Sequence, residues 1–308
     1  MSPFDERGFV RWLQRQRRRH HAPVQTGIGD DMAVLNLGGQ TLLVGTDMLL
    51  DGVHFDSGAH GPGVIGYKAV ACCLSDCAAM AARPLACCLS VALPRGYSDE
   101  DLKALTQAGV DACEAFECEL VGGDTTVWDH PLAVEVALTA AAYPDVRPIL
   151  RSGAREGDGL YVTGSLGGSR CGKHLTFVPR IGEAHLIATT IGSRLHAMID
   201  ISDGLAIDAD RIAEASGVMV VLDASQLDRV ASAAARGLSR TNGRALIDRV
   251  LGDGEDFELL VAADIDASAA DQLHLLPVGC VGAGSGVHLQ TGGDPPRPLD
   301  PVGYQHLR

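Results

Sequence analysis

The sequence lacks the features of a membrane or secreted protein. No uninterrupted apolar stretch reaches 18 residues, the length that a membrane-spanning helix needs. The opening residues, MSPFDERGFVRWLQ, contain no apolar core of a secretory signal peptide. We therefore expect a cytoplasmic protein that has no membrane partner.

Basic residues are also scarce. The 308 residues include 25 Lys and Arg against 39 Asp and Glu, which gives a formal net charge of −14. The basic residues form no long stripe, so the sequence argues against nucleic acid as a partner. One basic run, RRRHH at 17–21, follows a predicted amphipathic helix over 4–16. Cations favour the C-terminal end of a helix, and we interpret this run as a solvated helix end rather than a phosphate site.

Paired cysteine motifs are absent. The nine cysteines are an odd number without a CxxC pattern, which does not favour a structural disulfide or a zinc site. We interpret most of them as small, buried apolar residues. They are Cys72, Cys73, Cys77, Cys87, Cys88, Cys113, Cys118, Cys171 and Cys280.

The apolar pattern that is present predicts an α/β (α+β) protein of two domains, 1–147 and 148–308. In the first, we expect strands over 41–50 and up to Pro94, helices over 65–82 and 99–116, and a cap at Ser98. In the second, we expect a strand over 160–163, a helix over 207–216 and late strands around 257–263 and 276–284. The patterning breaks near residue 147, which sets the boundary.

Several aspartates stand where solvated carboxylates are uncommon: in glycine-rich turns, in an apolar strand and in an apolar helix. Two bare carboxylates about 4 Å apart repel by roughly 4 kcal/mol at an effective dielectric near 20, so a cation should balance them. Lys68 is the nearest basic candidate. Bound divalent metal is the simpler explanation, and oxygen ligands favour Mg²⁺ over zinc. The residues are Asp30, Asp31, Asp47, Asp76, Asp124, Asp200 and Asp203.

Each of these positions also has a purely structural interpretation. Asp30 or Asp31 could close a turn, Asp124 could form an Asx turn, and Asp203 could cap a helix. The loop TGSLGGS at 163–169 matches neither the Walker nor the Rossmann spacing, so alone it is a tight turn that could present N–H groups to a phosphate. The metal hypothesis therefore depends on the whole set of acids.

Seven motifs in order resemble the thiamine-monophosphate kinase family, whose superfamily includes aminoimidazole ribonucleotide synthetase. They are GIGDDMAVL, TDMLLDGVHF, YKAVACCLSDCAAMAARP, LVGGDTT, RSGAREGDGLYVTGSLGGS, DISDGLAIDADRI and GDGEDFELL. The resemblance implies a two-domain PurM-like architecture: an N-terminal ATP- and metal-binding sheet domain that pairs into a homodimer, and a C-terminal α/β domain. It also implies transfer of the γ-phosphoryl group of ATP to thiamine monophosphate, with several Mg²⁺ ions.

The resemblance also implies roles for individual residues. Those implied as metal ligands are Asp30, Asp31, Thr46, Asp47, Asp76, Asp124, Asp200 and Asp203, and among them Asp47, Asp76, Asp124 and Asp203 are the expected catalytic residues. ATP contacts are implied for Gly123, Asp124, Arg151 and Ser202, and contacts with thiamine monophosphate for His54, Glu255 and Tyr304. An acceptor phosphate is already ionised near neutral pH, so we assign no general base.

The sequence departs from the family pattern at Cys73, where asparagine is common, and at Asp253, which replaces a glycine. The segment 170–195 matches poorly. Two alternatives stay open: a sister ATP-dependent synthetase that releases free phosphate, and an inactive homologue that only binds nucleotide or metal.

Overall fold

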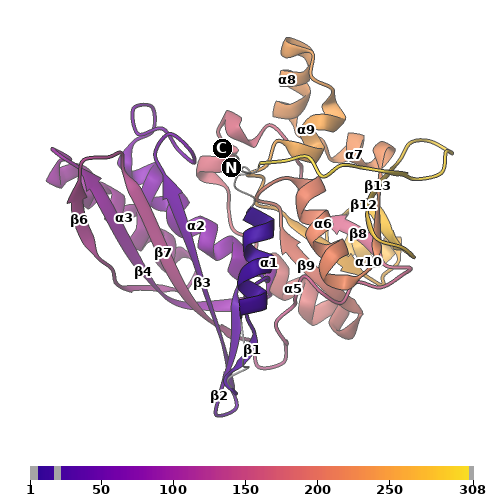
Figure 1. Ribbon diagram of the computed structural model, residues 1–308, viewed down its shortest axis with the longest axis horizontal. Helices are drawn as coiled ribbons and strands as arrows, with labels where there is room; N and C mark the ends of the chain where they lie inside the picture. Colours follow the sequence, from indigo (N-terminus) through magenta and orange to yellow (C-terminus); the bar gives the residue numbers. More distant parts are fainter. Residues whose placement is uncertain (1–5, 17–21, 305–308) are drawn as a thin grey trace.

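The computed structural model describes residues 6–16 and 22–304, in two halves that lie side by side, each built on its own sheet (Figure 1). The basic run at 17–21 lies outside the described residues. The described part of the predicted first helix is α1 (Glu6–Gln16). No helix in the described ranges combines the length and apolarity that a membrane crossing needs.

The first half is a mixed sheet covered by two helices, α2 (Pro62–Ala79) and α3 (Asp99–Ala115). The strands run in the order β1-β2-β3-β7-β4-β5. Strand β6 also pairs with β4, at residues 91–94 of β4, whereas β5 pairs with its residues 86–88. Their bounds are β1 (Val24–Thr26), β2 (Ala33–Leu37), β3 (Gln40–Leu50), β4 (Ala82–Pro94), β5 (Glu119–Gly122), β6 (Thr125–Trp128) and β7 (Ala133–Ala142).

Alternating sequence explains why only one face of this sheet is covered. Along β7, the side chains Val134, Val136 and Leu138 are buried, whereas the residues between them are half-exposed. Successive side chains of a strand point to opposite faces, so the buried set faces α2 and α3. Ser98 caps α3 as predicted, since its Oγ accepts a hydrogen bond from the Asp101 N–H at 3.0 Å. The predicted helix over 65–82 ends earlier, because β4 already begins at Ala82.

The second half has strand order β14-β13-β10-β12-β8-β11-β9, antiparallel except between β10 and β13. Its strands are β8 (Gly159–Val162), β9 (Leu195–Asp200), β10 (Met219–Asp223), β11 (Leu259–Ala263), β12 (Leu276–Gly282), β13 (Gly286–Gln290) and β14 (Arg297–Pro298). Its helices are α4 (Lys173–Thr176), α5 (Ile181–Ile191), α6 (Leu205–Ser216), α7 (Ala224–Val230), α8 (Ala233–Asn242), α9 (Leu246–Gly252) and α10 (Ala267–Gln272), with 3-10 turns at Ser169–Cys171 and Gly192–Arg194.

The two halves share a hydrophobic core. One continuous cluster of buried side chains runs from Leu74 and Leu105 in the first half to Ile187 and Leu259 in the second. Helix α2 packs against α4, α5 and β9, so it is the element that joins the halves. The segment 143–158 between the two sheets has no helix or strand. The predicted boundary near residue 147 falls in this segment, and separate domains on either side of it stay a prediction.

Candidate active site

A cavity of about 680 Å³ lies where the two halves meet, and it is lined by residues of both. Its lining includes nine carboxylates but only five Lys or Arg side chains. The carboxylates are Asp30, Asp31, Asp47, Asp76, Asp200, Asp203, Glu214, Asp253 and Glu255; the basic residues are Arg11, Lys68, Arg151, Arg170 and Arg211. This excess of negative charge is the main electrostatic feature of the cavity.

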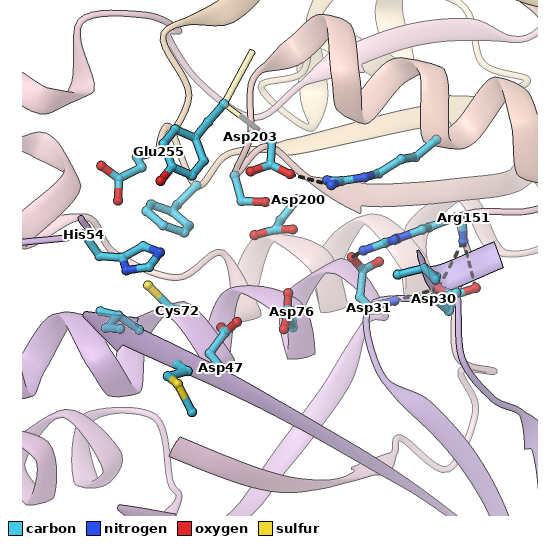
Figure 2. Close-up of a pocket in the computed structure, with 18 of the residues that line it drawn as sticks. Asp30, Asp31, Asp47, His54, Cys72, Asp76, Arg151, Asp200, Asp203 and Glu255 are labelled. Atoms are coloured by element: carbon cyan, nitrogen blue, oxygen red, sulfur yellow. Dashed lines mark hydrogen bonds and ion pairs between the residues drawn. The ribbon is translucent and has the colours of Figure 1, made fainter. Parts of the chain in front are cut away.

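Three of the carboxylates form a compact group. One oxygen from each of Asp31, Asp76 and Asp200 lies within 4.8 Å of the others. Asp31 precedes β2, Asp76 lies near the end of α2, and Asp200 ends β9. The packing of α2 against β9 therefore brings together Asp76 and Asp200, which are 124 residues apart in the sequence. Asp47, on β3, projects toward the same space (Figure 2).

Two observations show that this group is suited to a cation. Asp31 Oδ2 is buried, and none of the residues in the described ranges donates a hydrogen bond to it. The set offers only hard carboxylate oxygens, which are ligands that Mg²⁺ prefers. Ser75 Oγ donates to Asp200 Oδ2 at 2.6 Å and orients that carboxylate. The aspartates present thus fit a Mg²⁺ site.

Burial and mutual repulsion disfavour the charged form of these acids. Burial, followed by the charges of neighbouring aspartates, raises the pKa of Asp47 to about 6. The same causes raise the pKa of Asp30 to about 6, with Asp31 as the neighbour. The pKa values of Asp76 and Asp200 are raised as well, again mainly by burial. A bound cation would reverse this effect, because it favours the ionised carboxylates.

Arg151 organises one end of the cavity. Its guanidinium donates to Asp31 Oδ1 from Nη2 at 2.6 Å and from Nε at 3.1 Å. Its backbone N–H lies 3.3 Å from Asp30 Oδ1. Arg151 belongs to the segment between the two sheets, so this contact also ties that segment to the turn before β2.

Glu255 and His54 lie at the other end (Figure 2). Lys68 Nζ donates to Glu255 Oε1 at 2.5 Å and to the carbonyl oxygen of His54 at 2.6 Å, so one buried lysine of α2 positions both residues. His54 Nδ1 accepts a hydrogen bond from the Leu50 N–H at 3.0 Å. Glu255 has a φ of 53°, a left-handed conformation that is uncommon outside glycine.

The loop between β9 and α6 closes the cavity beside Asp200. Ser202 and Asp203 line it, and the backbone of Asp203 accepts a hydrogen bond from the Tyr304 N–H at 2.8 Å. The Asp203 carboxylate pairs with Arg211 of α6. Arg211 also donates to Asp208 Oδ1 at 2.5 Å, and burial raises the pKa of Asp208 to about 7.

Three residues with predicted roles do not line this cavity. Thr46 is exposed on the sheet face opposite to Asp47, and its Oγ1 donates to Glu135 at 2.5 Å. Gly123 and Asp124 lie between β5 and β6, and the exposed Asp124 accepts from the Thr125 N–H at 2.8 Å. Their roles stay predictions.

The glycine-rich loop at 163–169 follows β8 and leads into the 3-10 turn at Ser169–Cys171. Its backbone N–H groups at Gly167 and Gly168 already donate to the carboxylates of Asp256 and Asp253, at 2.9 Å each. These N–H groups are therefore occupied by protein oxygens rather than directed at a ligand. Asp253, which departs from the family pattern, takes part in this contact.

Sequence reasoning missed two further contributors to the site, Arg211 and Arg170. Arg211 stands three residues after Asp208 in DISDGLAIDADRI, and this spacing on a helix was the available signal. Arg170 lies in the poorly matched segment, and its Nε is 3.9 Å from Glu255 Oε2. Lys68 was expected only as a counter-charge, whereas it positions two residues of the cavity.

Comparisons with known proteins include several thiamine-monophosphate kinases. Residues 29–143 match the family described as AIR synthase related protein, N-terminal domain. The thiamine-monophosphate kinase of Rhodopirellula baltica is 36% identical, with 83% of this chain and 81% of that protein covered. That of Salmonella typhimurium is 33% identical over 94% of both chains. A solved structure, AaThiL complexed with AMPPCP and TMP, superposes with a TM-score of 0.84 at 27% identity and covers 98% of this chain and 96% of that one. The PurM-like fold implied by the motifs is therefore confirmed.

Proposed function

The chain belongs to the thiamine-monophosphate kinase family, and from this premise we propose that it transfers the γ-phosphoryl group of ATP to the phosphate of thiamine monophosphate. The products are thiamine diphosphate and ADP. A related structure carries AMPPCP and TMP together, which supports a site for two phosphate-bearing ligands in this fold.

The proposal that metal ions assist the phosphoryl transfer rests on the charge of the cavity. Nine carboxylates against five cations would repel two phosphate-bearing substrates. Phosphoryl transfer needs neutralisation of that charge and in-line positioning more than it needs covalent help from the protein. A cavity with this lining therefore suits Mg²⁺-bound phosphates and disfavours the same phosphates alone.

Asp31, Asp76 and Asp200 would hold the ions most directly, since their oxygens already lie together. Asp30, Asp47 and Asp203 line the same cavity and would complete or extend this set. When bound, Mg²⁺ neutralises phosphate charge and favours the ionised form of the carboxylates around it.

The remaining residues would orient the two substrates at opposite ends. Arg151 and Ser202 would contact the nucleotide. A neutral imidazole whose Nδ1 accepts a hydrogen bond carries its hydrogen on Nε2, so His54 would donate to the acceptor rather than remove a proton from it. Glu255 would face the thiazolium cation, and Tyr304 would contact a ring of the same substrate.

A homodimer would explain the position of Gly123 and Asp124. The face of the first sheet opposite to α2 and α3 is open, and Val44 and Met48 on β3 are 41% and 60% exposed. A patch of this kind marks an interaction surface. A second copy seated on this sheet would cover it, and Asp124 at the β5–β6 edge would then be available to the partner's cavity.

The test is a product assay with purified protein, ATP and thiamine monophosphate, first with Mg²⁺ and then with excess EDTA. We expect equal amounts of ADP and thiamine diphosphate, and loss of both with EDTA. Release of free phosphate in place of thiamine diphosphate would favour the sister synthetase. Nucleotide binding without turnover would favour an inactive homologue.

A further inference from the structure

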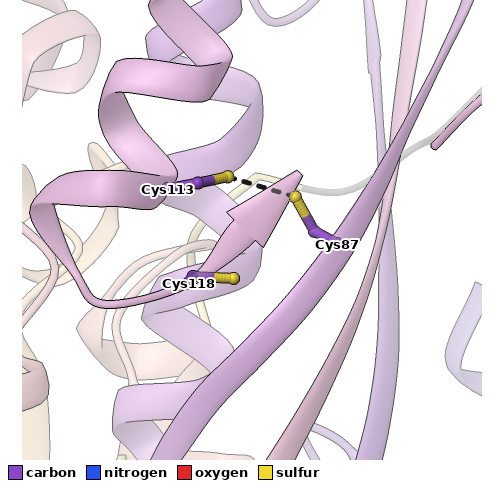
Figure 3. Close-up of side chains that lie close together, drawn as sticks. All are labelled: Cys87, Cys113 and Cys118. Carbon is purple, nitrogen blue, oxygen red and sulfur yellow. Dashed lines mark hydrogen bonds between the residues drawn. The ribbon is translucent and has the colours of Figure 1, made fainter. Parts of the chain in front are cut away.

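A second group of side chains that could together hold a metal ion lies away from the cavity, in the core of the first half. Cys87, Cys113 and Cys118 are buried, and their three sulfur atoms lie within 4.8 Å of one another (Figure 3). Cys87 Sγ and Cys113 Sγ are 3.2 Å apart. None of the three lines the cavity described above, and the proposed kinase chemistry uses none of them.

Local backbone structure places these sulfurs together. Cys113 lies near the end of α3, and its carbonyl oxygen accepts hydrogen bonds from the N–H groups of both Phe116 and Cys118. Glu117 takes a left-handed conformation, with φ at 55°, and reverses the chain. The chain thus returns Cys118, five residues after Cys113, to the side of Cys113. Cys87 comes from β4, which pairs with the strand that follows Cys118.

The number and kind of the ligands select the metal. Structural zinc sites in proteins almost always have four protein ligands, and among the described residues no histidine, carboxylate or fourth cysteine joins this group. Soft thiolates without oxygen or nitrogen partners favour Cu(I). A trigonal ion with metal–sulfur distances of about 2.3 Å requires sulfur atoms about 4 Å apart. The three sulfur atoms already lie within 4.8 Å of one another, so small shifts are enough to reach this geometry.

Binding of Cu(I) by this group releases protons, because the thiolate and not the thiol is the metal ligand. Hydrogen bonds from Cys113 and Cys87 lower the pKa of Cys118, so Cys118 offers a thiolate most readily, whereas the pKa values of Cys113 and Cys87 are raised. The protons on the Cys113 and Cys87 thiols pass to solvent as the ion binds.

We propose that Cys87, Cys113 and Cys118 form a three-coordinate site for Cu(I). Binding involves no change of oxidation state, because the ion is supplied as Cu(I) and the thiols are reduced. The route of entry is the turn between α3 and β5. Cys118 in this turn is 5% exposed, and the neighbouring edge strand β5 is largely exposed.

The test is an anaerobic titration of the reduced, full-length protein with Cu(I) in competition with a chromogenic Cu(I) chelator. We expect one ion per chain to resist the chelator. Cys118→Ala and Cys113→Ala should each weaken its binding by more than about 100-fold, beyond what loss of a supporting contact costs. Cys280→Ala and Cys171→Ala remove exposed cysteines elsewhere and should leave binding unchanged.

X-ray absorption of the copper-loaded wild-type protein keeps the proposal testable even where a core variant fails to fold. Three sulfur ligands at one distance support the site. Oxygen or nitrogen ligands, equal binding by Cys118→Ala that retains its fold, or a Cys87–Cys113 disulfide that forms in place of copper binding would each overturn it.

Discussion

The chain gathers two sets of three potential metal ligands, and their surroundings differ in almost every respect. Asp31, Asp76 and Asp200 meet at an open cavity between the two halves, where further carboxylates add to the negative charge. The set formed by Cys87, Cys113 and Cys118 is enclosed in the core of one half, among apolar side chains. We propose that the oxygen set takes divalent ions that come with the substrates, and that the sulfur set takes one ion away from solvent.

This contrast shows how burial selects chemistry. Burial of the carboxylates and repulsion among them destabilise the folded chain when no cation is bound. Both effects raise the pKa values of Asp47, Asp76 and Asp200. Thiols are neutral when protonated and pack as small apolar groups, so the sulfur set costs little without an ion. Changes in the first set should therefore alter catalysis, and changes in the second should not.

The largest expected effect is on turnover. Asp76→Asn keeps the size of the side chain but removes a charged oxygen from the compact carboxylate group. We expect kcat to fall by about 100- to 1,000-fold, the range seen when one preorganised electrostatic contact is removed. Steady-state formation of thiamine diphosphate measures this. Near-normal turnover in Asp76→Asn would show that the residue holds no catalytic ion.

The buried pair between Lys68 and Glu255 gives the next largest effect. Lys68→Met leaves the Glu255 carboxylate without its main partner, and breaking a buried ion pair costs about 3 kcal/mol. Chemical denaturation of the single variant measures the loss. The double variant Lys68→Met/Glu255→Gln removes both charges and should recover most of it. Equal stability of the single and double variants would contradict this role for the pair.

The pH dependence of stability separates the two sets further. Because the folded state raises the pKa of Asp30 and Asp47 to about 6, it holds protons that the unfolded chain has already lost above pH 4. Stability of the metal-free protein should therefore fall as the pH rises from 5 to 8, with a drop in Tm of about 5 °C.

Thermal unfolding in EDTA at each pH measures this fall. Added Mg²⁺ should raise the Tm more at pH 8 than at pH 5, because the carboxylates are then ionised. The slope should be shallower in Asp76→Asn. A Tm that rises from pH 5 to 8 would contradict the sign of these pKa shifts.

The smallest effect is expected from the sulfur set. Cys118→Ala removes one buried sulfur and should destabilise the protein by about 1 kcal/mol, as a typical core truncation does. Its kcat and KM should stay within about twofold of wild type, since the sulfur set and the cavity are separate sites, and distant sites act independently. A large loss of turnover would link the sulfur set to catalysis and remove the contrast between the two.

Much of the fold could be predicted from local patterns. Strand β3 and helices α2 and α3 follow from apolar periodicity and from the Ser98 cap, to within a few residues. The residues after β10 were harder, because the sequence pattern predicts one helical stretch through Ala235, whereas α7 ends at Val230 and α8 begins at Ala233. Short-range signals therefore gave the elements, whereas the sheet order needed the folded chain.

The site was predictable in its chemistry but not in its contacts. Acids in apolar settings indicated a shared cation, and Asp31, Asp76 and Asp200 do lie together. Strand alternation places Thr46 and Asp47 on opposite faces of the sheet. No local pattern could show which of the two faces the cavity, because this depends on which face of the sheet α2 covers. The sulfur set was invisible for the same reason, since Cys87 meets Cys113 only through the packing of α3 on the sheet.

The most direct test of the central claim is a titration of the metal-free protein with Mn²⁺, followed by electron paramagnetic resonance. The claim predicts that wild-type protein binds Mn²⁺, that Mg²⁺ displaces it, and that Asp76→Asn binds it much more weakly while Cys118→Ala binds it normally. Equal binding of Mn²⁺ by wild type and Asp76→Asn would contradict a metal site built on the cavity carboxylates.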